Sequence, residues 1–210
     1  MFVPKTSTLA QVWNSGTVIV MDNLPLWKRC RIVANPLRLR LLAHLLESPR
    51  QYVKAVAGEL ELTEDVASKN LQLLASGGFL KCESVSKYLY YTLAESDDLL
   101  TALLWELKNQ SALDPIIHML TALTHERRVL LVALLSKTSM DVNSLCCQMK
   151  MSGSAAKRHL DKLARRGWVE VDGDVCTLCF PSNPLGRAMI ELVKNDSTLA
   201  QVWQKGEQGL

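Results

Sequence analysis

The chain has 210 residues, of which 48% are hydrophobic and 21% charged, and its formal net charge is +3 at pH 7. This composition excludes a disordered tail, and no apolar run approaches the ~20 residues that cross a bilayer. The length suits one large or two small domains, each able to bury a core. The first residues, MFVPKTSTLAQVW, lack a basic-then-apolar signal pattern, so we expect a cytoplasmic protein.

An N-terminal arm is predicted over residues 1–23. It contains the segment STLAQVW (Ser7–Trp13), which returns unchanged at Ser197–Trp203. Leu9, Val12 and Trp13 have the i, i+3, i+4 spacing of one helix face, so each copy is interpreted as a packing element that needs a surface to lie on. We expect the arm to dock within the chain or on a partner subunit.

Four helices and a hairpin are predicted in residues 24–110. Thr63 is expected to cap the third helix, which ends at two glycines, and β-type residues then flank the segment ESVSK. The signals in chain order are a helix containing Leu41, Leu42, Leu45 and Leu46, a helix near Val53–Leu60, a helix from Thr63 to Gly77–Gly78, strands at Phe79–Cys82 and Tyr88–Thr92, and a helix at Asp98–Leu107.

The same order of signals recurs in residues 111–210. Val33–Lys81 aligns without a gap on Ala122–Glu170 at an offset of 89, and 11 of the 49 pairs are identical. Ser152 takes the place of Thr63, strands are expected at Trp168–Val171 and Val175–Phe180 around Asp172-Gly173, and a last helix at roughly Pro184–Trp203. The predicted fold is mainly α with small β-hairpin wings (α+β), built as tandem winged helix-turn-helix domains over 24–110 and 111–210.

The quoted segments resemble the ArsR family of bacterial transcriptional regulators. In the first copy they are VANPLRLRLLAHLL, LTEDVASKNLQLLASGGFLK and KYLYYTL; in the second, ALTHERRVLLVALL and MSGSAAKRHLDKLARRGWVEV. The resemblance covers roughly residues 24–108 and 112–195. It implies binding to double-stranded operator DNA, a dimer formed by the outer helices, and in many members metal or thiol sensing. Because this chain carries two copies, it could form an internal pseudo-dimer or a homodimer.

The third helix of the second copy is the stronger DNA-binding candidate. The candidate contacts there are Ser154, Lys157, Arg158, Lys162, Arg165 and Arg166. In the first copy they are Ser68, Lys69, Gln72 and the hairpin residue Lys87. Glu64 and Asp65 would repel phosphates beside the first set, and Asp172 and Asp174 make the second hairpin tip acidic. Residues 24–110 hold 11 basic and 10 acidic side chains, against 11 and 8 in residues 111–194.

The cysteines and histidines give only weak signals for a metal site. Cys176 and Cys179 would face opposite sides of one strand, and Cys146 and Cys147 are adjacent on one helix. The Cys-x-Cys pair of family metal sensors would fall on Asp141 and Asn143, so that site does not carry over. His118 and His125 are expected on one helix, and His159 as a structural residue.

No catalytic constellation stands out, so no enzyme and no cofactor are expected. The leading hypothesis is a DNA-binding transcriptional regulator. Its rivals are a protein-interaction module that has lost DNA binding and a thiol- or metal-responsive sensor.

Overall fold

The computed structural model describes residues 24–95, 97–110 and 112–195, which form two halves with the same order of elements. The first half contains α1 (Leu26–Val33), α2 (Pro36–Glu47), β1 (Gln51–Tyr52), α3 (Val53–Glu59), α4 (Glu64–Ser76), β2 (Leu80–Val85), β3 (Tyr88–Leu93) and α5 (Asp98–Asn109). The second contains α6 (Asp114–Ala122), α7 (Glu126–Leu135), β4 (Met140–Asp141), α8 (Val142–Met149), α9 (Gly153–Ala164), β5 (Val169–Asp172), β6 (Val175–Leu178) and α10 (Pro184–Asn195). The architecture is mainly helical with small antiparallel sheets, as predicted for the α+β class.

Parts of the sequence prediction lie outside the described residues. These are the arm at 1–23, both copies of STLAQVW, and the predicted end of the last helix beyond Asn195.

Each half contains one three-stranded antiparallel sheet, with strand orders β1-β3-β2 and β4-β6-β5. The short strands β1 and β4 were not predicted. The first hairpin is longer than expected, because Val85 pairs with Tyr88 and the turn is only Ser86–Lys87 rather than ESVSK. In the second, Asp172 pairs with Val175, so the turn is Gly173–Asp174 and not the predicted Asp172-Gly173.

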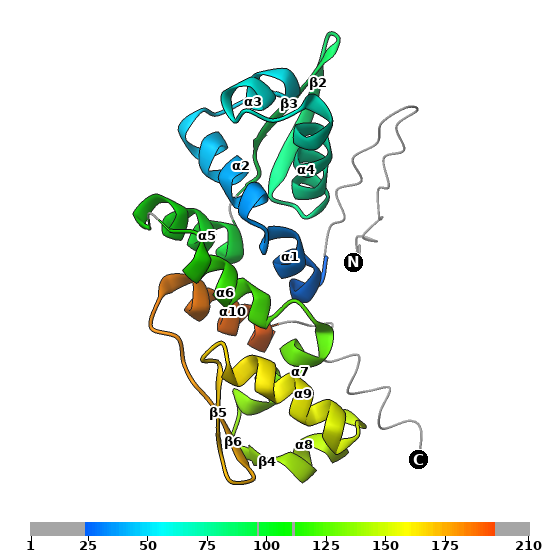
Figure 1. Ribbon diagram of the computed structural model, residues 1–210, viewed down its shortest axis with the longest axis vertical. Helices are drawn as coiled ribbons and strands as arrows, with labels where there is room; N and C mark the ends of the chain where they lie inside the picture. The colour runs from blue at the N-terminus through cyan, green and yellow to red at the C-terminus, as the bar shows by residue number, and fades with distance from the viewer. Residues whose placement is uncertain (1–23, 96, 111, 196–210) are drawn as a thin grey trace, which may run out of the picture.

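The outer helices of the two halves pack against each other in the middle of the molecule. Helix α1 contacts α6, and α5 contacts α10 along much of their length. Figure 1 shows these four helices between the sheet of the first half at the top and that of the second half at the bottom. The buried apolar side chains form one continuous core that includes Leu99 and Leu103 of α5 and Met189 and Val193 of α10. The two halves therefore share a packed interface and are not separated by an exposed linker.

The predicted caps of the third helices are confirmed. The Thr63 side chain accepts a hydrogen bond from the Val66 backbone N–H, and Ser152 does the same for Ala155. The glycines that follow each helix, Gly78 and Gly167, have φ of +75° and +68°, a conformation that glycine adopts without strain. These local signals place α4 and α9 within a few residues of their predicted positions.

The gap-free alignment of the two halves is wrong in the first two helices. Arg38 donates from Nε to the Ile32 carbonyl, and Arg128 donates in the same way to Ala122, so the equivalent of Arg38 is Arg128 and not Arg127. The helix caps Asn35 and His125 are also 90 residues apart. From β1 and β4 onward the offset is 89, as the caps Thr63 and Ser152 indicate. The change arises because α7 (10 residues) is two residues shorter than α2 (12 residues), whereas the loop that follows it is one residue longer.

No helix within the described residues is both long and apolar enough to cross a membrane.

Candidate nucleic-acid interface

Helix α9 combines a buried apolar face with an exposed basic face. Ala156, Leu160 and Leu163 are almost fully buried, and they anchor the helix on α7 and α8. The other face carries the exposed side chains Ser154, Lys157, Arg158, Asp161, Lys162 and Arg165. Four of these are cations and one is an anion, so the exposed face is distinctly positive.

The cations on this face are not neutralised by neighbouring carboxylates. The ion pairs of the described residues involve none of Lys157, Arg158, Lys162 and Arg165. Arg165 donates from Nε to the Asp161 backbone carbonyl at 3.2 Å, within its own helix. Unpaired cations on an exposed helix face are suited to phosphate oxygens and to the acceptors of guanine edges.

Arg166 differs from the other predicted contacts on this segment. It is half-buried, and its Nε donates to Thr121 Oγ1 of α6 at 2.6 Å. The side chain therefore ties the end of α9 to α6 instead of extending from the basic face, and the geometry does not favour it as a DNA contact.

The equivalent face of α4 in the first half is less basic. Lys69 is exposed, but Ser68 is half-buried and its Oγ accepts a hydrogen bond from the Gln72 side chain at 3.3 Å. Glu64 and Asp65 are exposed in the first turn, where their negative charges interact favourably with the helix dipole. Helix α4 therefore lacks the exposed face of unpaired cations that α9 has.

The two hairpin tips carry opposite charges. Lys87 lies at the tip of the first hairpin, with its Nζ 5.3 Å from the centre of the Tyr88 ring. At the second tip, Asp172 and Asp174 are both exposed. The half with the more basic helix therefore has the more acidic hairpin, as the sequence predicted.

Sequence reasoning missed the basic residues at the start of α7. Arg127 and Arg128 come from this helix, and with its cap His125 they lie beside Arg158 and Lys162 of α9. The signal was present as the run His-Glu-Arg-Arg, but about 30 residues separate it from α9 in the sequence. The expectation that His118 and His125 share a helix was wrong, because α6 ends at Ala122.

All six cysteines are free thiols. Cys176 is buried in β6, and Cys179 lies one residue beyond the end of that strand. Cys146 and Cys147 are both on α8. Within the described residues, no three His, Cys, Asp or Glu side chains lie close enough together to hold a metal ion.

The comparisons with known proteins bear on the second half. Residues 125–171, from the cap of α7 to β5, match the model of the family described as bacterial regulatory protein, arsR family. Curated proteins and solved structures give no significant match. The matched segment therefore carries an ArsR-like helix-turn-helix that contains α9, and the first half lies outside the match.

Proposed function

We propose that this chain is a DNA-binding transcription regulator built from two tandem winged helix-turn-helix domains, in which α9 enters the major groove. The observation that carries the proposal is the exposed face of α9, whose four cations make no ion pair within the described residues. The match of residues 125–171 to an ArsR-family model supports the same function.

Two structural correspondences support the tandem organisation. Both halves have the same element order and the same strand order in their sheets. Arg38 and Arg128 also make the same bond to the carbonyl of the residue six positions earlier. An unrelated pair of domains would not be expected to share this detail.

The proposal is tested by fluorescence anisotropy with a labelled duplex over a series of salt concentrations. Lys157→Gln and Arg165→Gln each remove one cation from the exposed face, and each should weaken binding and reduce the salt slope by about 0.9 if the cation contacts a phosphate. Arg187→Gln is the matched control, because Arg187 is an exposed cation on α10 and is not part of α9. Absence of binding at low salt, or equal affinities for all four proteins, would contradict the proposal.

The first half favours a second candidate function, which is protein interaction. Besides Glu64 and Asp65, α4 exposes the apolar side chains of Val66 and Leu73, which are 40% and 38% exposed. Acidic and apolar groups together suit a protein surface better than phosphates. If Lys69→Gln leaves DNA affinity unchanged while Lys157→Gln lowers it, the first half serves in assembly and the second in DNA binding.

A further inference from the structure

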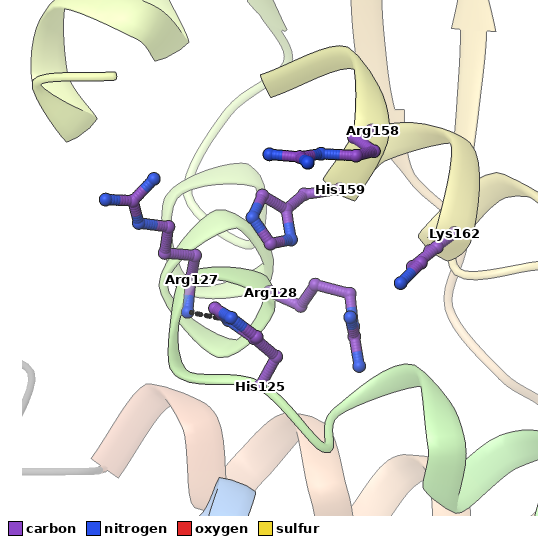
Figure 2. A pocket seen from close by; sticks show the side chains of 6 residues that line it. All are labelled: His125, Arg127, Arg128, Arg158, His159 and Lys162. Carbon is purple, nitrogen blue, oxygen red and sulfur yellow. Dashed lines mark hydrogen bonds between the residues drawn. The ribbon is translucent and has the colours of Figure 1, made fainter. Parts of the chain in front are cut away.

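A basic pocket lies between the start of α7 and the inner edge of α9. Its volume is about 480 Å³. Figure 2 shows the side chains of α7, its cap and α9 that line the pocket. The six lining residues are His125, Arg127, Arg128, Arg158, His159 and Lys162.

The pocket holds four cations and is lined by no carboxylate. Arg128 is directed toward the end of α6, where it donates to the Ala122 carbonyl, to the Thr121 carbonyl at 3.2 Å and to Thr124 Oγ1 at 2.8 Å. Arg127, Arg158 and Lys162 form no ion pair within the described residues. Two guanidinium groups and one ammonium group therefore remain available to a ligand.

Two histidines complete the lining. The rings of His125 and His159 are 4.7 Å apart between centroids. His159 is only 9% exposed, and its Nδ1 is buried without a hydrogen-bond partner among the described residues. A buried polar atom without a partner is uncommon in folded proteins, and the residue that carries it lines the pocket.

The charges around the histidines disfavour their protonation. Burial, then His125 and the cations Arg128, Arg127 and Arg158, lower the pKa of His159 to about 4. Burial and the cations Arg128, Arg127 and Arg31 lower the pKa of His125, with Glu126 as the opposing carboxylate. Both rings are then neutral at pH 7, and the cavity has a positive potential that no carboxylate among its lining residues neutralises.

The first half provides an internal comparison, because the same place there keeps only two of the four cations, Arg38 for Arg128 and Lys69 for Arg158. With the offset of 90 in α2 and of 89 in α4, Asn35 and Leu37 replace His125 and Arg127. In α4, Asn70 and Leu73 replace His159 and Lys162. Asn70 is satisfied, since its amide donates to the Val66 carbonyl at 2.8 Å and its oxygen accepts from Arg38. The fold therefore does not require Arg127 and Lys162, or the two histidines, at this position.

We propose that this pocket is a binding site for a phosphate-type oxyanion. Arg127, Arg158 and Lys162 would form ion pairs with its oxygens, and the neutral His159 ring would add a hydrogen bond. The volume lies in the range of small-molecule pockets and exceeds the needs of an inorganic ion alone. The phosphate group is therefore carried either by a small phosphorylated molecule or by the DNA backbone, and only the second source rests on the proposed function.

Inorganic phosphate is the first probe, titrated into the full chain at constant ionic strength while the histidine ring signals are followed by NMR. We expect saturable shifts of His125 and His159, and a rise in the pKa of His159 by roughly one unit or more because the anion stabilises the imidazolium. Arg127→Gln should weaken phosphate binding by about tenfold or more, and Arg187→Gln should leave it unchanged. Shifts that do not saturate, or that persist in Arg127→Gln, would overturn the proposal.

Duplex DNA is the second probe and separates the two sources of phosphate. If Arg127→Gln weakens DNA binding and DNA shifts the His159 signal as phosphate does, the ligand is the DNA backbone. If Arg127→Gln loses phosphate binding but keeps its DNA affinity, the ligand is a free phosphorylated molecule. Because Lys157 does not line the pocket, Lys157→Gln tests the α9 face alone. If the chain does not bind phosphate but Lys157→Gln still lowers DNA affinity, only this inference is contradicted. If the chain binds phosphate but not DNA, only the proposed function is contradicted.

Discussion

Replacing His159 by asparagine should remove part of the acid sensitivity of the fold. The pKa of His159 is about 4 in the folded chain, against an ordinary value of 6.5. Between these two values the unfolded chain binds a proton that the folded chain does not, so protonation favours unfolding as the pH falls. Above pH 6.5 the ring is neutral in both states and contributes no pH dependence. The effect grows from pH 6.5 downward and is complete below pH 4.

The size of the effect follows from the pKa difference. At 1.36 kcal/mol per pH unit, the lowered pKa of His159 corresponds to a loss of about 3 kcal/mol between pH 7 and pH 4. His159 lines a pocket that is open to solvent, so solvent screening reduces this figure and about 3 kcal/mol is its upper limit. His125 acts in the same direction, because its pKa is lowered by burial and by the same cations. Asparagine is the residue that occupies the equivalent place in the first half, as Asn70, so the fold accommodates it.

Urea denaturation of the wild type and of His159→Asn at several pH values between 4 and 7 measures the effect. Buffers free of phosphate are needed, since phosphate would occupy the proposed site. The loss of unfolding free energy on going from pH 7 to pH 4 should be smaller in the variant, by up to about 3 kcal/mol. His118→Asn, at an exposed position of α6, should behave like the wild type. Equal pH dependence of His159→Asn and the wild type would refute the reasoning.

Three further substitutions test other parts of the fold by urea denaturation. Arg128→Met should lower the free energy of unfolding by about 2–4 kcal/mol, because it leaves the Ala122 and Thr121 carbonyls of α6 without the hydrogen bonds that Arg128 donates; an unchanged midpoint would contradict this role. Gly167→Ala should cost about 1 kcal/mol because φ is +68°, whereas Gly58→Ala, in a helix and with open space around it, should be neutral or stabilising; equal effects would exclude a conformational cause. Glu106→Leu should raise stability by about 1 kcal/mol, since Oε1 is buried and unpartnered among the described residues; a loss of stability would indicate a missed partner.

Local signals were enough to locate the helix that carries the candidate interface. Helix α9 is marked in the sequence by the capping serine Ser152 before it, by apolar residues at helical spacing within it and by Gly167 after it. All three signals depend on neighbours in the sequence. The basic side chains between them follow from the same spacing, because positions not used for packing must be exposed. For this reason the exposure of Lys157, Arg158, Lys162 and Arg165 is as expected.

Features that depend on distant residues were not predicted. Arg166 follows α9 directly and looks equivalent to Arg165 in the sequence, but its partner Thr121 is 45 residues away. The pocket likewise needs α7 and α9 to lie side by side, which no periodicity within either helix encodes. The register of the repeat failed for a related reason. Leucines are so frequent in α2 and α7 that a shift of one residue still pairs leucine with leucine, and the bonds of Arg38 and Arg128 together with the helix caps decide the alignment.

Under the proposed tandem organisation, the packed interface between the halves gives a physical reason for carrying two domains in one chain. In a dimer of identical chains, every substitution on the third helix appears twice, so both helices keep the same surface. Here α1 packs on α6 and α5 on α10 within a single chain, so the pairing is retained while the two third helices differ. Carboxylates begin α4, whereas unpaired cations cover α9. Under the proposed function, this difference lets one half bind DNA while the other takes on a separate contact, which a symmetric dimer could not do without losing half of its DNA-binding surface.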